Sequence, residues 1–235
     1  MNDMSFNILI DESGDTTNLK DNPTNRVMGA LIFFEDYSVL ETKFLQFVDN
    51  CPEIKQFIKK KPHDLKFETL KKQPNSEELF ELALNFLIEN KCKFYWHPIK
   101  DKDRKHQKKE YEVRFTKLVE SCNLDILPNL ILVLKRENKR MGKIGLYLDR
   151  GTYNTKNEKT YINIYFGDNS FNYYEAIGEH YQIPITYIKP KGLHWCADII
   201  AGVTREGFYK ESLYSKVYKL ISNNRFADIV YGEFA

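Results

Sequence analysis

A short apolar run near the N-terminus, Asn7-Ile8-Leu9-Ile10, ends abruptly in a stretch that carries three carboxylates, Asp11-Glu12-Ser13-Gly14-Asp15. An apolar run of this length that stops at turn residues is typical of a buried strand. Burying an unpaired charge is costly, so a buried strand that ends in acids needs a partner cation, a metal, or a turn that returns the acids to water. Ser13-Gly14 predicts such a turn, and the second apolar run over 26–34 predicts a hairpin.

The order of the predicted elements favours a single α/β domain with one main sheet flanked by helices. A length of 235 residues suits one domain that carries a sizeable insertion, so we assign residues 1–235 to one domain. A mainly helical, basic insertion is expected around 52–140. Strands are predicted over 6–10, 26–34, 64–67, 92–99, 143–150 and 182–188, and helices over 37–48, 76–90, 111–122, 124–134, 157–165, 193–209 and 213–221.

Charge and cysteine usage narrow the class of protein. The net charge is only +2, but basic residues gather in three runs: seven in 55–72, six in 100–109 and five in 135–143. One such run is ordinarily a solvated face, whereas three in the middle of a chain indicate a basic surface for nucleic acid. The four Cys are scattered without a CxxC pair, which fits a reducing cytosol. We see neither a signal peptide nor an apolar run long enough for a membrane span, so a cytoplasmic protein without a membrane partner is expected.

The stretch Leu193 to Val203 predicts a helix that is buried nearly all round, because almost every residue is apolar or small. The exceptions, His194, Asp198 and Gly202, follow one another at intervals of four and form one narrow stripe. Such a stripe aims an imidazole and a carboxylate at a common target, and the glycine lets that target approach closely. The competing interpretation is a structural Asp198 paired with Arg150, Arg205 or a backbone amide, and both interpretations remain open at this point.

A third acid, Asp149, ends the predicted strand over 143–150. Alone it would cap the turn that follows, but two strands and one apolar helix now each deliver one Asp to the edge of the core: Asp11, Asp149 and Asp198. Carboxylates that face one another repel unless cations lie between them. Mg²⁺ and Mn²⁺ take hard oxygen ligands, and a pair of such ions clamps the attacking and leaving oxygens of a phosphodiester. The set therefore predicts a site for two Mg²⁺ or Mn²⁺ ions of the kind that two-metal nucleases use.

These stretches together resemble the bacterial and phage family known as domain of unknown function 3800, which is placed among ribonuclease-H-like folds. The matching pieces extend over most of the chain: Ile10-Asp11-Glu12-Ser13-Gly14-Asp15, Leu65-Lys66, Leu148-Asp149-Arg150, and the run from Gly192 to Gly202. The first and last pieces are specific in combination, whereas Leu-Asp-Arg alone is weak. The resemblance implies a ribonuclease-H-like mixed sheet with an acidic metal site.

By that resemblance Asp11, Asp149 and Asp198 are the metal ligands and the catalytic acids. Glu12 is a further catalytic candidate, although adjacent strand residues point to opposite faces, so it joins only if the strand has already turned. Lys66 and Arg150 are the candidate substrate-binding residues, and Lys66 would contact a phosphate. His194 departs from the family, which usually has Gln there. Its imidazole would act as a general base or as a neutral hydrogen-bonding substitute for the amide.

The leading functional hypothesis is a metal-dependent nuclease that acts on DNA or RNA, in phage defence or in a mobile element. The alternative is a non-catalytic ribonuclease-H-like module that binds nucleic acid or serves as a scaffold. A nucleotide hydrolase that uses the same metal site is a third possibility. The chain contains no GxxxxGK[ST] phosphate loop and no GxSxG elbow, which argues against a P-loop NTPase and a serine hydrolase.

Overall fold

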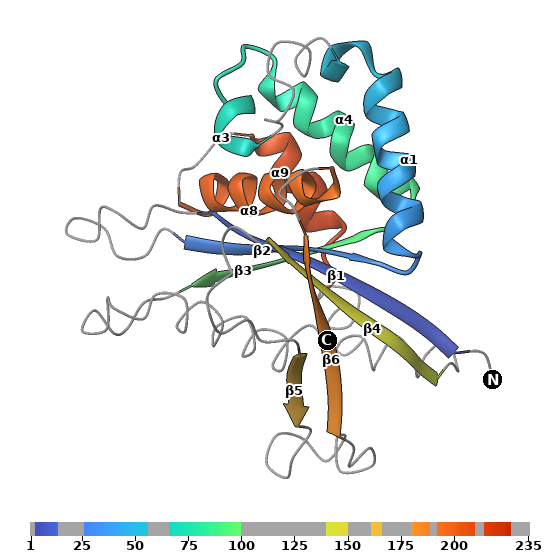
Figure 1. Ribbon diagram of the computed structural model, residues 1–235. Coiled ribbons are helices and arrows are strands. Elements are labelled where there is room, and N and C mark those ends of the chain that lie inside the picture. Colours follow the sequence, from blue (N-terminus) through green and yellow to red (C-terminus); the bar gives the residue numbers. More distant parts are fainter. Residues whose placement is uncertain are drawn as a thin grey trace.

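The computed structural model of the chain describes residues 3–13, 26–55, 66–99, 140–149, 161–165, 180–188, 192–209 and 214–226. The predicted helices over 111–122 and 124–134, the basic run over 100–109 and Arg150 lie outside these residues. The described elements form a mixed α/β fold in which helices cover a mixed sheet (Figure 1). None of the described helices is long and apolar enough to cross a membrane.

The six described strands form a sheet in the order β3-β2-β1-β4-β6-β5. β1 (Asp3–Ser13), β2 (Arg26–Phe33) and β3 (Lys93–Ile99) form an antiparallel meander, which confirms the predicted hairpin. On the other side of β1, β4 (Arg140–Asp149) and β6 (His180–Ile188) run parallel to it, and β5 (Tyr161–Tyr165) pairs antiparallel with β6. β1 is therefore central, with antiparallel neighbours on one side and parallel neighbours on the other.

Strand β1 is buried on both faces, which explains why its sequence is a continuous apolar run rather than an alternation. Leu9 belongs to the apolar cluster beneath the helices, and its neighbours Ile8 and Ile10 are buried as well. Because successive side chains of a strand point to opposite faces, Asp11, two residues beyond Leu9, lies on the same face as Leu9. The acid at the end of the strand is thus directed at the helical layer.

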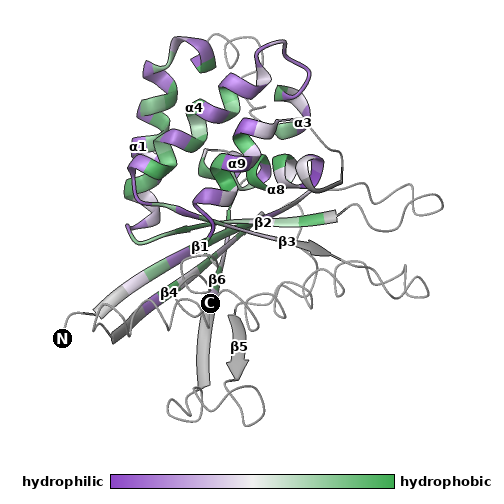
Figure 2. Cartoon of the chain, turned by 180° about the vertical axis from the view of Figure 1, so that it is seen from behind, coloured by the Kyte–Doolittle hydropathy of each residue, from purple (hydrophilic) through white to green (hydrophobic). Residues whose placement is uncertain are grey.

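The helical layer lies on one face of the sheet (Figure 1). It comprises α1 (Tyr37–Asn50), α3 (Phe67–Leu70), α4 (Ser76–Glu89), α8 (Leu193–Tyr209) and α9 (Ser215–Asn223). α8 lies against β1 and β2, and the other helices gather around it. In Figure 2, α1 and α4 alternate hydrophilic and hydrophobic segments, as expected of helices with one buried face, whereas the first residues of α8 are buried nearly all round.

The contact of α8 with the sheet is unusually close at Gly29 of β2. A Cβ atom at this position would lie 2.5 Å from the backbone N of Ala201 and 2.7 Å from its Cα. Gly29 is also the residue that pairs with Asp11 across the β1–β2 ladder. This close approach of α8 to the sheet therefore occurs beside the acid at the end of β1.

The start of α8 is held by a residue from α1. The Glu41 carboxylate accepts a hydrogen bond of 2.8 Å from the backbone N–H of Leu193, one of the groups that a helix N-terminus leaves without an intrahelical partner. Gly192, which precedes it, has φ of +60°, and a side chain here would overlap the carboxylate of Glu41. The glycine is therefore needed for both its backbone conformation and its lack of a side chain.

Two predicted elements differ in the structure. The helix predicted over 157–165 is wrong over its second half, because Tyr161–Tyr165 form strand β5, whereas residues 157–160 lie outside the described residues. The Tyr and Ile residues of β5 suit a strand that pairs with β6. The edge strand predicted over 64–67 is also wrong at its end, because Lys66 is the N-cap of α3. Phe67 and Leu70 lie three residues apart and are both buried, which favours a helical turn here. Within the proposed insertion, residues 66–99 contribute α3, α4 and β3, and β3 pairs with β2.

Candidate functional site

Asp11 and His194 meet where β1 ends beneath the first turn of α8. Both side chains are largely buried, and His194 Nε2 lies 3.7 Å from Asp11 Oδ2. This distance is longer than that of a direct hydrogen bond, so the imidazole and the carboxylate are close neighbours and not a hydrogen-bonded pair. The structure thus brings together two of the predicted site residues, an acid from the start of the chain and an imidazole from near its end.

Asp198 follows His194 by one helical turn and uses one of its two carboxylate oxygens within the fold. Asp198 Oδ2 accepts a hydrogen bond of 2.6 Å from the backbone N–H of Phe67, the first residue of α3. The sequence left open whether Asp198 belongs to a functional site or is paired within the fold. The structure shows that one of its oxygens is paired with a backbone amide. Within the part of the chain that the structure describes, the second oxygen, Oδ1, makes no hydrogen bond to the protein, and a carboxylate oxygen of this kind can accept a cation.

Burial raises the pKa of the Asp198 carboxyl from an ordinary 3.8 to about 6. The Phe67 amide and the positive charges of Lys66 and Arg205 oppose this rise, and Glu68 adds to it. Desolvation is the largest cause, because a carboxylate that has lost its water is less stable than the neutral acid. A perturbed carboxyl of this kind is a marker of functional sites, although structural clusters produce it too.

The residue that approaches Gly202, the third member of the stripe on α8, is Phe67. A Cβ atom at Gly202 would overlap the aromatic ring of Phe67. The sequence correctly indicated a close approach at this glycine, but the partner is a side chain of α3. Phe67 was not among the predicted site residues. The signal in the sequence was Gly202 itself, because a glycine on an apolar helix indicates that another group packs closely against the helix at that position.

Asp149 is the last residue of β4, and its backbone pairs with Ile188 of β6. Ile10 of β1 and Leu148 of β4 are register partners on parallel strands, so Asp11 and Asp149 are the next residues of two adjacent strands at the same edge. The side chain of Asp149 lies outside the part of the structure that is described, as does that of Glu12, whose backbone pairs with Met28. Arg150 lies outside it entirely.

Lys66 is exposed and stands directly before α3, where its carbonyl accepts hydrogen bonds from the N–H groups of Thr69 and Leu70. Its charge acts on Asp198, as the lowering effect on the pKa of that carboxyl indicates. The predicted phosphate-binding residue therefore lies near one of the predicted acids.

The donors at this site are of the kind that suits a hard divalent cation, but their number is limited. Carboxylate oxygens are the ligands that Mg²⁺ and Mn²⁺ prefer. Among the residues that the structure describes, no group of three or more His, Cys, Asp or Glu is arranged to hold one ion. A metal site built on Asp11 and Asp198 therefore requires at least one further donor, and Asp149 stands at the adjacent register position.

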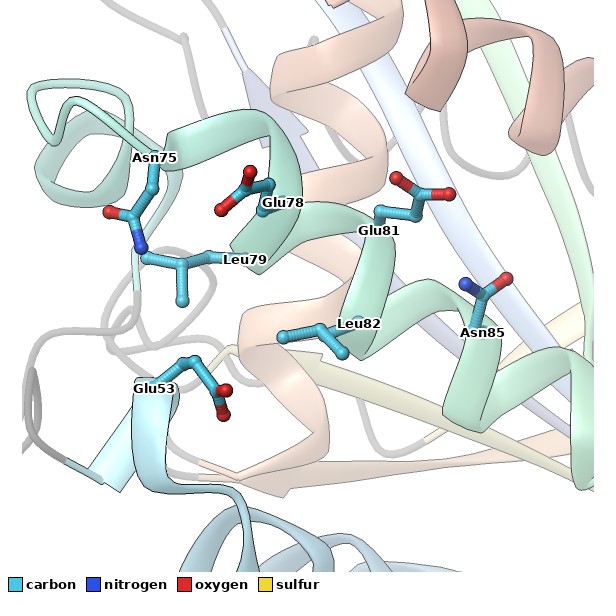
Figure 3. Close-up of a pocket in the computed structure, with 7 residues that line it drawn as sticks. All are labelled: Glu53, Asn75, Glu78, Leu79, Glu81, Leu82 and Asn85. Atoms are coloured by element: carbon cyan, nitrogen blue, oxygen red, sulfur yellow. The ribbon is translucent and has the colours of Figure 1, made fainter.

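A pocket elsewhere on the surface is separate from these residues. It lies between α4 and the helical turn over 52–55 and has a volume of about 350 Å³ (Figure 3). None of the predicted site residues lines it; its walls are formed by Glu53, Asn75, Glu78, Leu79, Glu81, Leu82 and Asn85. Acidic and amide side chains over two leucines do not reproduce the chemistry expected of a phosphate-binding site.

Comparison of the chain with models of known protein families, with curated proteins and with solved structures found no match.

Proposed function

We propose that the protein is a metal-dependent nuclease that hydrolyses phosphodiester bonds of DNA or RNA. The observation that carries this proposal is the contact between Asp11 and His194, 3.7 Å apart at the end of the central strand. Burying an acid is costly, and buried acids beside an imidazole are enriched at functional sites. Asp198, one turn further along α8, adds a second buried carboxyl with a raised pKa.

The proposed fold is ribonuclease-H-like. The support for this is the arrangement of the sheet, in which an antiparallel meander of β1, β2 and β3 is followed by β4 and β6 running parallel to β1 on its other side. Acids at the carboxyl ends of adjacent parallel strands lie at one edge of such a sheet, which is where open α/β sheets bind their ligands.

In this proposal Asp11, Asp149 and Asp198 hold two Mg²⁺ or Mn²⁺ ions, and Glu12 is a further candidate. Asp198 would offer Oδ1, because its Oδ2 is engaged by the N–H of Phe67. Bound divalent ions would neutralise the charge that develops on the phosphate and make water a stronger nucleophile at neutral pH. His194, beside Asp11, would accept a proton as a general base or orient a water by hydrogen bonding.

Substrate binding would rest on positive charge. Lys66 is exposed beside Asp198 and would contact a phosphate, and Arg150, the residue after Asp149 in the sequence, would make a second contact. Phosphate contacts of this kind are sequence-independent and weaken with salt. The proposed partner is therefore a nucleic acid, either DNA or RNA. The proposed setting is phage defence or a mobile element.

The test is the substitution Asp11→Asn, which keeps the shape of the side chain and removes its charge. We expect it to abolish Mg²⁺-dependent cleavage of a labelled nucleic acid while thermal unfolding remains cooperative; Asp198→Asn should do the same. Asp49→Asn, on the exposed face of α1, is the matched control and should cleave as the wild type does. Full activity in Asp11→Asn would disprove the proposed site.

A non-catalytic nucleic-acid-binding or scaffold module is the second candidate, and one observation favours it. Asp198 already has a structural partner in the amide of Phe67, and no group of three His, Cys, Asp or Glu among the described residues is arranged to hold one ion. Calorimetric titration with Mn²⁺ separates the two candidates. Binding that is lost in Asp11→Asn supports the nuclease, whereas no binding at millimolar Mn²⁺ supports the module.

A further inference from the structure

The short helix α3 is attached to α8 through its first residue, Phe67. The backbone N–H of Phe67 donates to Asp198, and the Phe67 ring occupies the space that the missing side chain of Gly202 leaves open. The same ring stacks on Phe80 of α4, with centroids 5.3 Å apart. A helix of four residues does not form by itself in water, so its conformation depends on this attachment.

Charged side chains of α3 and α8 surround the Phe67 ring. Glu68 pairs with Lys71 at 2.6 Å and with Arg205 of α8 at 2.9 Å. The Lys71 ammonium and the Arg205 guanidinium lie 5.5 and 6.0 Å from the centroid of the Phe67 ring, within the range of cation–π attraction. Glu206 of α8 accepts from Arg205 at 3.2 Å. Three kinds of contact therefore fix the position of α3 on α8: a backbone hydrogen bond, the fit of the Phe67 ring against Gly202, and an ion-pair network.

These contacts also fix the position of the Lys66 backbone. Lys66 directly precedes Phe67, and its carbonyl is fixed by the hydrogen bonds from Thr69 and Leu70, while its side chain is exposed. An unrestrained lysine loses much side-chain and backbone entropy on binding a ligand. The attachment of α3 to α8 has already ordered the backbone of Lys66, so binding a ligand would not incur that part of the entropy cost. The ordered backbone lies near the carboxylate of Asp198.

We propose that Phe67 is a positioning residue for Lys66. Its ring packs against Gly202 and its N–H donates to Asp198, and together these contacts hold Lys66 where it contacts a nucleic-acid phosphate next to the acidic site. This inference rests on the proposed function and goes beyond it, because it assigns roles to Phe67 and Gly202 that act only through Lys66. Asp198 would then serve two purposes: Oδ2 attaches α3, and Oδ1 is left for the proposed ions.

The experiment measures how the affinity for a labelled oligonucleotide depends on salt, with single- and double-stranded DNA and RNA as probes. One lost phosphate contact lowers the slope of log affinity against log salt concentration by about 1. We expect this loss in Lys66→Ala, where the contact itself is removed. We expect the same loss in Gly202→Ala, where the new methyl group displaces the Phe67 ring. The double variant should lose no more than either single one, because both remove the same contact.

Gly207→Ala is the matched control, since it is also on α8 and its Cβ would lie 2.5 Å from the ring of Tyr218 on α9. It strains the same helix without touching α3, so its salt slope should equal that of the wild type. If Gly202→Ala does not fold, Phe67→Leu replaces it, because Leu keeps an apolar side chain but lacks the ring that the two cations contact.

The outcomes separate the two levels of the argument. A wild-type protein that binds none of the probes overturns both the proposed function and this inference. Binding and cleavage by the wild type, with an unchanged salt slope in Gly202→Ala but a reduced slope in Lys66→Ala, overturns this inference alone. An unchanged slope in Lys66→Ala overturns this inference together with the phosphate contact that the proposed function gives to Lys66. Slopes that fall additively in the double variant also overturn it, because Gly202 would then act independently of Lys66.

Discussion

Gly29→Ala is expected to damage the fold and the candidate site together. Gly29 lies on β2 opposite Asp11, and the backbone of Ala201 in α8 passes directly above it. The added methyl group has no free space, because the atoms that it would meet belong to the helix backbone and cannot rotate away. The helix must therefore move off the sheet beside the site.

The size of the effect follows from the distances. The new Cβ would lie 2.5 Å from Ala201 N, 2.7 Å from its Cα and 2.8 Å from its Cβ. Ordinary carbon contacts are about 3.5–4.0 Å, so α8 must withdraw by about 1 Å. Overpacking of this kind costs typically 1–3 kcal/mol. The lower entropy of the unfolded chain returns about 0.4–1 kcal/mol, which leaves a net loss of about 2 kcal/mol if the overpacking cost is near its upper limit.

Urea unfolding followed by tryptophan fluorescence measures this loss, because Trp195 lies on α8 and Trp96 on β3. The midpoint should fall while the slope of the transition stays constant. In thermal unfolding the same loss corresponds to a fall in Tm of roughly 4–8 °C. Under the proposed function, calorimetric titration should also show weaker binding of the proposed Mn²⁺ ions, since withdrawal of α8 carries His194 away from Asp11.

Gly145→Ala on β4 is the matched control. A Cβ atom there would meet the side-chain oxygen of Asn7 at 2.6 Å and the ring of Tyr147 at 3.0 Å. Both are side chains that can move, Asn7 at the cost of its hydrogen bond to the carbonyl of Glu35. We expect a loss smaller than about 1 kcal/mol. If Gly29→Ala were as stable as Gly145→Ala and bound Mn²⁺ equally well, the close approach of α8 to β2 would not govern either the fold or the site.

Two further predictions concern charges that the fold buries or pairs. Because the pKa of Asp198 is raised from 3.8 to about 6, the folded state binds this proton more tightly than the unfolded chain, and the stability it contributes below about pH 4 is lost as the pH rises through 6. Asp198→Asn does not titrate, so from about pH 4 to 7 it should gain roughly 3 kcal/mol relative to the wild type in urea unfolding; a difference independent of pH contradicts this explanation. Glu41→Gln replaces a charge-assisted hydrogen bond to the N–H of Leu193 with a neutral one and should lower the stability by about 1 kcal/mol in thermal unfolding. Glu89→Gln at the exposed end of α4 should change it by less than about 0.5 kcal/mol, and equal losses in the two variants would contradict the role of Glu41.

The strands that frame the site were predictable because their patterns are local. The apolar runs around Ile8 and Leu31 identify β1 and β2, and both strands form the predicted hairpin. The buried character of α8 was predictable for the same reason, since its first residues are apolar or small. The stripe of His194, Asp198 and Gly202 followed from helical spacing alone.

Local patterns failed where long-range contacts select the conformation. Phe67 belongs to a helical turn because its N–H is captured by Asp198 and its ring is seated on Gly202, partners that lie far along the chain. Residues 161–165 were predicted to be helical, and pairing with β6 makes them a strand. Glu41 was not singled out, because its role depends on the N-terminus of α8, which only the folded chain brings to α1.

The carboxylates at the end of β1 were the first indication of a site, and the sequence by itself determined which residue types are available there. A run of apolar residues that ends in Asp11, and an apolar helix that carries His194 and Asp198, are properties of local spacing, which needs no tertiary contact. Only the tertiary structure decided that His194 lies 3.7 Å from Asp11 and that one oxygen of Asp198 is bonded to α3. The reason is physical: spacing along the chain sets which face a side chain occupies, whereas the packing of α8 on Gly29 sets how closely two faces approach.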